Sequence, residues 1–165
     1  MSSENRAAHA LGRTYPGGTQ ACVAAMNVKA KALGLTSARF EDTSGLHAGN
    51  QAHARDLARL VQVAHRYPLI RAFSTQEQAT VPAGRGQRTF GNSNGLVHNP
   101  RWEIGLSKTG FIQEAGRCLV MQARLATRPV VIVLLDSVGR YSRLGDAQRI
   151  KQWLEGVAAP TRRRR

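Results

Sequence analysis

Residues 102–136 read WEIGLSKTGFIQEAGRCLVMQARLATRPVVIVLLD, and this stretch decides the fold. Apolar and polar residues alternate over 102–109, a pattern that predicts a strand with one buried face. Two further strands are expected at 117–126 and 129–136, and the last is almost wholly apolar, which favours a place at the centre of the sheet. Because a two-residue link joins these two strands, we expect them to pair antiparallel as a hairpin.

The segments on either side of this stretch have the patterns of helices and loops. Apolar residues recur every three to four positions over 18–33 and again over 51–66, which predicts two helices, the second ending before Pro68. A closing helix is expected over 142–155, and the polar residues 74–100 are expected to form loops around one or two short strands. Helices followed by antiparallel strands and a last helix make an α+β chain.

The composition is that of a basic globular chain of 165 residues. Hydrophobic residues make up 42% and charged residues 21%, which excludes a disordered chain or a coiled coil. Lys and Arg number 24 against 10 Asp and Glu, a formal net charge of +14, and part of the excess lies in a basic tail at 159–165. This charge predicts an anionic partner such as nucleic acid, an acidic membrane surface or an acidic polymer. A basic surface without a specific partner remains the alternative.

The cysteines, the histidines and the apolar runs predict neither a metal site nor a membrane span. Cys22 and Cys118 stand in apolar runs without metal-ligand spacing, so we expect small buried side chains, with a disulfide as the alternative. The five histidines lack such spacing too, and we expect no metal and no cofactor. No apolar run is long enough to span a membrane, and the first residues lack the pattern of a signal peptide, so a chain made as written is expected to stay in the cytoplasm.

The tripeptide Lys108-Thr109-Gly110 lies at the end of the first predicted strand and is the clearest chemical motif in the sequence. At a strand end the ammonium group of Lys108 can attract an anion, and Thr109 can donate its hydroxyl to a carboxylate. Gly110 has no side chain and lets a substrate backbone approach the strand closely. Taken alone, the tripeptide is better explained as a solvated lysine at a turn.

A second motif, Ser3-Glu4-Asn5, brings a hydroxyl and an amide close together at the start of the chain. Two such groups can serve one site. By itself, however, the tripeptide is no evidence for a site and is better explained as a polar terminus or as the N-cap of a helix.

Together with several other blocks, the two motifs resemble a known family. Penicillin-recognising serine enzymes use Ser-x-x-Lys, Ser-x-Asn and Lys-Thr-Gly in that order, and this chain holds the last two in order. From residue 1 to about residue 155 the chain is similar to the D-alanyl-D-alanine endopeptidases of the penicillin-binding protein 7 type. It departs from them at Ala52-His53, where the family more often has Ser-Thr, and we interpret this as a change at a helix start with little effect on the site. Further blocks that carry the resemblance are Tyr15-Pro-Gly-Gly, Met26-Asn-x-Lys-Ala-Lys-x-Leu-Gly-Leu, Phe40-x-Asp-x-Ser-Gly-Leu, Asn92-x-Asn-x-Leu-Val and Leu106-Ser-Lys-Thr-Gly-Phe.

The resemblance implies the activity of a serine-type D-Ala-D-Ala carboxypeptidase or endopeptidase on peptidoglycan stem peptides in the periplasm, without a cofactor. Ser3 would join a proton relay with the lysine of Ser-x-x-Lys, and Asn5 would hydrogen-bond the peptide amide of the substrate and help to hold that lysine. Lys108 would supply positive potential and orient Ser3. Thr109 would bind a carboxylate of the stem peptide, and Gly110 would leave room for it. The intact parent enzyme would also bind β-lactams.

The nucleophile motif Ser-x-x-Lys does not occur in residues 1–165. None of the nine serines has a lysine three positions later, and Ser3 and Ser137 have an arginine there, which does not act as a base. We therefore expect residues 1–158 to form an incomplete β-lactamase/transpeptidase-like domain, the C-terminal part of a longer enzyme, which folds poorly alone and is inactive. The alternative is a non-catalytic basic protein that binds the cell wall or nucleic acid. No basic stretch interleaved with aromatic residues indicates a specific nucleic-acid partner.

Overall fold

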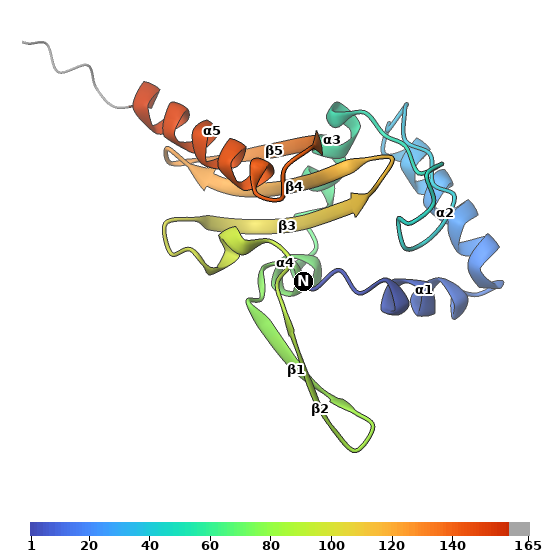
Figure 1. The fold of residues 1–165 in the computed structure, drawn as a ribbon. Coiled ribbons are helices and arrows are strands. Elements are labelled where there is room, and N and C mark those ends of the chain that lie inside the picture. The colour runs from blue at the N-terminus through green and yellow to red at the C-terminus, as the bar shows by residue number, and fades with distance from the viewer. Residues whose placement is uncertain (159–165) are drawn as a thin grey trace, which may run out of the picture.

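The computed structural model describes residues 1–158 and shows a three-stranded antiparallel sheet with helices on both faces, which confirms the predicted α+β class (Figure 1). The predicted basic tail at 159–165 lies outside the described residues. The helices are α1 (Asn5–Arg13), α2 (Gly18–Ala32), α3 (Ala54–Ala64), α4 (Pro68–Thr75), the 3-10 helix η1 (Gly95–His98) and α5 (Ser142–Ala158), and the strands are β1 (Gln78–Ala83), β2 (Gly86–Gly91), β3 (Glu103–Ile112), β4 (Gly116–Leu125) and β5 (Arg128–Ser137).

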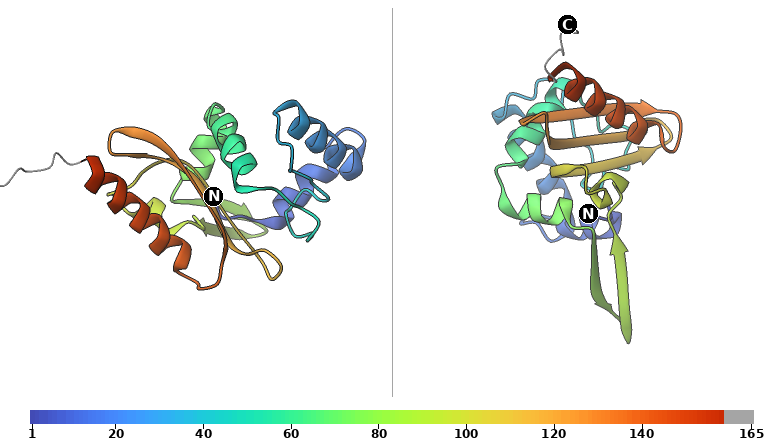
Figure 2. Two further views of the ribbon diagram at one scale, coloured as in Figure 1. Left: turned by 90° about the horizontal axis from the view of Figure 1, so that it is seen from above. Right: turned by 90° about the vertical axis from the view of Figure 1, so that its left-hand side faces the viewer.

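The order of the three-stranded sheet is β3-β4-β5, so β4 lies at its centre. The prediction that the apolar strand at 129–136 is central is therefore wrong, because β5 pairs with β4 alone among the described strands. Its apolar sequence has a different cause. The sheet lies between α5 on one face and α3 on the opposite face, and both helices contact β5 (Figure 2).

The predicted hairpin between the last two strands is confirmed. Leu125 of β4 pairs with Arg128 of β5, and the two residues between them, Ala126 and Thr127, have positive φ angles of 46° and 69°. Left-handed backbone at both central positions gives the turn the twist of the strands that it joins.

The core lies between the sheet and α5. Alternate residues of β4 point toward α5, and the side chains at these positions are at most 1% exposed. The remaining members of the cluster come from β5, from the segment before β3 and from α5. This core therefore holds β4 in place, and β4 is the strand that pairs with β3. Its buried residues are Leu96, Trp102, Leu119, Met121, Ala123, Leu125, Ile132 and Ala147.

All three helices that the sequence predicts are present, the last of them as α5, and two further α-helices, α1 and α4, are present that it does not predict. The expected helix at 18–33 is α2, and the one at 51–66 is α3, which begins three residues later, directly after His53. Pro68 follows the end of α3, as expected, but it also begins a new helix, α4. The fixed φ and the missing N–H of proline suit the first position of a helix. At the start of α1 the carboxylate of Glu4 accepts a hydrogen bond from the backbone N–H of Arg6 at 3.0 Å, so the helix-cap interpretation of this segment is confirmed.

The polar segment 74–100 contains the short hairpin of β1 and β2, as predicted, and this hairpin projects from the body of the molecule (Figure 1). No helix within residues 1–158 is both long and apolar enough to cross a membrane.

Candidate active site

A cavity of about 920 Å³ is bordered by β3, by the segment before α1 and by the loop between α2 and α3. All five residues singled out from the sequence line this cavity. Ala52 also lines it, so the departure from the family pattern at this position reaches the cavity as well as the start of α3. The five predicted residues are Ser3, Asn5, Lys108, Thr109 and Gly110.

The ammonium group of Lys108 joins the two motifs. Its Nζ donates a hydrogen bond to Ser3 Oγ at 2.7 Å, although the two residues are 105 positions apart in the chain, and a second one to the carbonyl oxygen of Thr109. Burial lowers the pKa of Lys108 below its usual value, and the positive charge of Arg143 lowers it further. Within residues 1–158 no carboxylate forms an ion pair with Lys108. The cavity therefore holds a positive charge that is available to an anion.

The tripeptide Lys108-Thr109-Gly110 lies inside β3 and not at its end, because the strand continues to Ile112. The end of the strand that the sequence predicts at Thr109 is thus three residues too early. Among the described strands, β3 pairs with β4 alone, so its other edge has no neighbouring strand. The backbone of Lys108-Thr109-Gly110 lies in this strand, which leaves one edge of the tripeptide open to a ligand.

Ser3 adopts a left-handed backbone conformation, with φ of 58°, directly before Glu4, the N-cap residue of α1. A non-glycine residue rarely takes this conformation, and such residues cluster at functional sites. Here the turn at Ser3 brings its hydroxyl to Lys108, while Asn5 begins α1 on the wall of the cavity. No described residue forms a hydrogen bond with the side-chain amide of Asn5, which leaves that amide available to a ligand.

Arg143, in the first turn of α5, is a site residue that sequence reasoning missed. Its guanidinium group donates to the carbonyl oxygens of Gly110 and Cys118, both at 3.3 Å, and its buried Nε has no partner among the described residues. Burial and the neighbouring charge of Arg117 lower the pKa of Arg143. The sequence carries no signal for this role, because one arginine among many becomes special only when α5 packs against the sheet.

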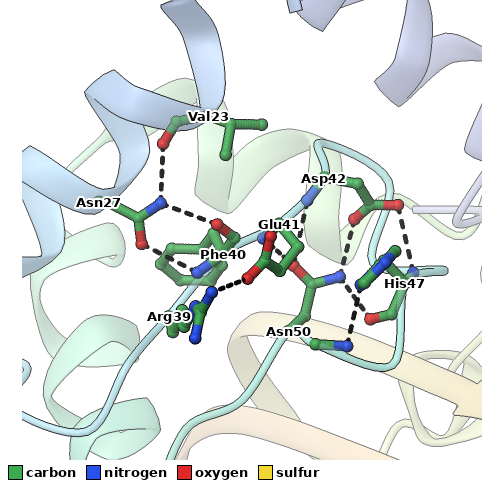
Figure 3. Close-up of polar contacts among 9 residues, drawn as sticks. Val23, Asn27, Arg39, Phe40, Glu41, Asp42, His47 and Asn50 are labelled. Carbon is green, nitrogen blue, oxygen red and sulfur yellow. Dashed lines mark hydrogen bonds and ion pairs between the residues drawn. The ribbon is translucent and has the colours of Figure 1, made fainter. Parts of the chain in front are cut away.

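The loop between α2 and α3 forms the wall of the cavity opposite β3 and is held by two polar side chains (Figure 3). The amide of Asn27 pairs with both backbone groups of Phe40, at 2.8 and 2.9 Å. The carboxylate of Asp42 accepts hydrogen bonds from five donors at 2.7 to 3.3 Å: Ser44 Oγ, Asn50 Nδ2 and the backbone N–H groups of Gly45, Leu46 and His47. Figure 3 shows this carboxylate beside Asn50 and His47.

The sequence predicts a loop here but not the hydrogen bonds inside it, although all five donors to Asp42 lie within eight residues of it in the sequence. Burial raises the pKa of Asp42, but the hydrogen bonds from Ser44, Asn50 and the backbone of the turn outweigh burial and bring the pKa to about 2. The carboxylate is therefore ionised throughout the neutral range, and it fixes the turn that lines the cavity.

Both cysteines are free thiols, so the alternative of a disulfide is not realised. Cys118 lies on the wall of the cavity, whereas Cys22 lies in α2. Within the part of the chain that the structure describes, no three side chains of His, Cys, Asp or Glu form a group that could hold a metal ion.

Solved structures that resemble this fold include D-alanyl-D-alanine carboxypeptidases and penicillin-binding proteins. A D-alanyl-D-alanine carboxypeptidase from Mycobacterium tuberculosis H37Rv superposes with a TM-score of 0.84 at 26% identity, over 97% of this chain and 61% of that one. Penicillin-binding protein D2 from Listeria monocytogenes, in a cefotaxime-bound form, superposes with a TM-score of 0.76 at 26% identity, over 91% of this chain and 60% of that one. The class defined by fold and site is thus that of the penicillin-recognising DD-peptidases.

Within this class the chain belongs to the D-alanyl-D-alanine carboxypeptidase family, peptidase family S11, whose model matches residues 1–139. It is 46% identical over 157 residues to the D-alanyl-D-alanine endopeptidase of Pseudomonas aeruginosa, which covers 94% of this chain and 51% of that protein. The chain spans about half the length of the curated relatives that it matches.

Proposed function

We propose that the chain provides the substrate-binding part of a serine-type D-Ala-D-Ala carboxypeptidase or endopeptidase that acts on peptidoglycan stem peptides. The observation that carries this proposal is the 2.7 Å contact between Lys108 Nζ and Ser3 Oγ on the wall of the cavity. It joins the Ser-x-Asn and Lys-Thr-Gly motifs of the family across 105 residues of sequence.

The site supports recognition of a peptide that ends in a carboxylate. The charges of Lys108 and Arg143 attract the anion, and the hydroxyl of Thr109 donates to it. The open edge of β3 offers backbone groups to an extended peptide, which would lie antiparallel to the strand. Gly110 leaves space at the point of closest approach, and the amide of Asn5 reaches the peptide from α1.

The chemistry proposed is acyl transfer through a covalent serine intermediate. The serine of a Ser-x-x-Lys motif attacks the carbonyl carbon of the penultimate D-Ala, and the bond to the leaving amine breaks. The proton of the attacking serine passes to the lysine of the Ser-x-x-Lys motif and from there to Ser3, while Ser3, polarised by Lys108, passes its own proton to the amine that leaves. Water then attacks the acyl-enzyme ester, which releases the shortened peptide and restores the serine.

We also propose peptidoglycan as the partner of this chain, β-lactams as ligands of the complete site and the periplasm as its place of action. The net charge of +14 supports an anionic polymer as partner. The cefotaxime-bound form of the Listeria protein supports the ligand class, because that protein shares this fold.

The proposal is tested with a joined protein, in which the amino-terminal half of the Pseudomonas aeruginosa relative precedes residues 1–165 at the matched position. We expect the joined protein to hydrolyse peptidoglycan fragments, and the 165-residue chain by itself to hydrolyse none, since its serines lack the Ser-x-x-Lys pattern. Two substrates separate the two activities: release of D-Ala from a pentapeptide reports a carboxypeptidase, and conversion of a cross-linked dimer to monomers reports an endopeptidase. A folded joined protein that hydrolyses neither substrate contradicts the proposal.

Replacing Asp42 by asparagine in the joined protein is expected to lower the free energy of unfolding by about 1–2 kcal/mol at pH 7, after allowance for partial exposure of the carboxylate. The pKa of Asp42 is lower in the folded chain than in the unfolded chain, so its contribution is complete above about pH 4. This contribution disappears as the pH falls toward the folded pKa of about 2.

Urea unfolding at pH 7, 5 and 3 measures this difference. The control is Asp146→Asn, which removes an exposed carboxylate paired with Arg149 and is expected to change stability by less than about 0.5 kcal/mol. A difference between wild type and Asp42→Asn that stays constant from pH 7 to pH 3 contradicts the assignment.

A further inference from the structure

Three hydrogen-bonding groups form a chain behind the wall of the cavity that Thr109 lines. Thr109 Oγ1 donates to Ser93 Oγ at 2.7 Å, and Ser93 Oγ donates to the carbonyl oxygen of Met1 at 3.1 Å. The backbone N–H of Ser93 donates to the same carbonyl oxygen, also at 3.1 Å. Ser93 thus contacts both β3 and the segment that carries Ser3, and the function proposed above assigns it no role.

The protons of this chain can be counted. Each hydroxyl has one proton, and a carbonyl oxygen only accepts. Ser93 uses its proton on Met1, so the proton between the two hydroxyls belongs to Thr109. In this state Thr109 presents only lone pairs to the cavity, and lone pairs repel a carboxylate.

We propose that Ser93 is a positioning residue whose hydroxyl turns round when a carboxylate enters the cavity. Ser93 then donates to Thr109, and Thr109 donates to the carboxylate. The carbonyl oxygen of Met1 loses one donor but keeps the backbone N–H of Ser93, so it is not left unpaired. Only two hydroxyl protons rotate, and no bond between heavy atoms changes. The inference rests on the function proposed above, because it requires a carboxylate at Thr109.

The neighbours of Ser93 hold its backbone while leaving its hydroxyl free to rotate. On one side, Asn92 Nδ2 donates to the carbonyl oxygens of Ser74 and Gln76, at 3.0 and 2.9 Å. On the other side the fully buried Asn94 donates to Ser107 Oγ at 2.8 Å. Two fixed residues therefore enclose one hydroxyl that can change its partner.

Ser93 strengthens the bound state in two ways. Thr109 is only 5% exposed, so water has little access to its oxygen, and without Ser93 that oxygen would lack a donor once its proton points to the ligand. A hydroxyl that accepts a hydrogen bond also becomes a stronger donor, because bonds in a chain polarise one another. Removing the Ser93 hydroxyl should therefore weaken the binding of a carboxylate but not of a neutral group.

The test is an NMR titration of the 165-residue chain with diacetyl-L-Lys-D-Ala-D-Ala and with the same peptide as a C-terminal amide. Ser93→Ala is expected to bind the acid about 3- to 10-fold more weakly than wild type, the effect of one lost hydrogen bond. It should bind the amide as wild type does. Ser93→Thr keeps a hydroxyl at the same position and should restore binding of the acid.

Thr80→Ala is the matched control, since it removes an exposed hydroxyl that bonds only Thr89 on the projecting hairpin. The same titration on the joined protein, made inactive at its nucleophile, covers the case in which the shorter chain is unfolded. Ser93→Ala that binds the acid as tightly as wild type, or that loses acid and amide equally, overturns the role of Ser93. Wild type without a preference for the acid over the amide contradicts the proposed function itself.

Discussion

Lys108→Met in the joined protein is expected to slow acylation by a penicillin about 10²- to 10³-fold, the usual effect of removing one preorganised charged donor from an active site. The substitution removes the ammonium group that contacts Ser3 Oγ and leaves a side chain of similar length. The cavity then loses both the orientation of Ser3 and part of the positive potential that attracts the carboxylate. The rate constant of acylation, followed by stopped-flow with a fluorescent penicillin, measures the effect.

Lys151→Met is the matched control for this experiment. Lys151 lies on α5, pairs with Glu155 and packs over Trp102, and it is not among the residues that line the cavity. Its replacement should leave the acylation rate unchanged. Equal rates for wild type and Lys108→Met, in a protein that is folded, would show that the contact with Ser3 has no part in the reaction.

The lowered pKa of Lys108 also predicts how the binding of a carboxylate ligand changes with pH. Only the protonated form carries the charge that attracts a carboxylate, so binding is strongest below the pKa of Lys108 and weakens as the pH rises through it. Because burial and Arg143 lower this pKa, the loss should begin at a lower pH than an ordinary lysine would give. In Lys108→Met this loss of carboxylate binding at alkaline pH should be absent.

Asn94→Ala is expected to lower the free energy of unfolding of the joined protein by about 2–4 kcal/mol, because it leaves buried polar groups without partners. The Asn94 side chain is fully buried, donates to Ser107 Oγ at 2.8 Å and accepts from the backbone N–H of Leu96 at 3.1 Å. Through Ser107 it ties the 3-10 helix η1 to β3 next to Lys108. The loss should therefore be accompanied by slower acylation.

Asn99→Ala provides the comparison for this stability measurement. The side-chain oxygen of Asn99 accepts one exposed hydrogen bond, from the backbone N–H of Arg101 at 3.0 Å, and replacing this side chain should cost less than about 1 kcal/mol. Urea unfolding at neutral pH compares the two variants. Equal losses for Asn94→Ala and Asn99→Ala would contradict the assignment of Asn94 as a buried link between η1 and β3.

The sequence was sufficient for the features that depend on local pattern. The alternation of apolar and polar residues predicts β3, the strand that carries Lys108. A two-residue link predicts the hairpin of β4 and β5, whose turn is Ala126-Thr127. The apolar run at 129–136 misleads, because coverage of both faces by helices makes a strand as apolar as a central position does. The short helix α4 is missed because a proline marks the end of one helix and the start of the next equally well.

Only those residues of the candidate site that belong to the two motifs could be predicted from the sequence. Lys108 and Ser3 are identified by resemblance, and the structure brings them together. Arg143 and Ser93 acquire their positions from packing between distant segments, which no local pattern records. Asp42 differs from them, because its five donors all lie within eight residues of it in the sequence, and an Asp followed by Ser and Gly is a local signal for a turn of this kind.

Covalent labelling by a fluorescent penicillin, followed by intact mass measurement, tests most directly the claim that residues 1–165 carry the Ser-x-Asn and Lys-Thr-Gly part of a penicillin-recognising site. The joined protein should gain one adduct per molecule, on the serine of its Ser-x-x-Lys motif, and the 165-residue chain alone should gain none. An adduct on any of the nine serines of the 165-residue chain, or a folded joined protein that stays unlabelled, would contradict the account.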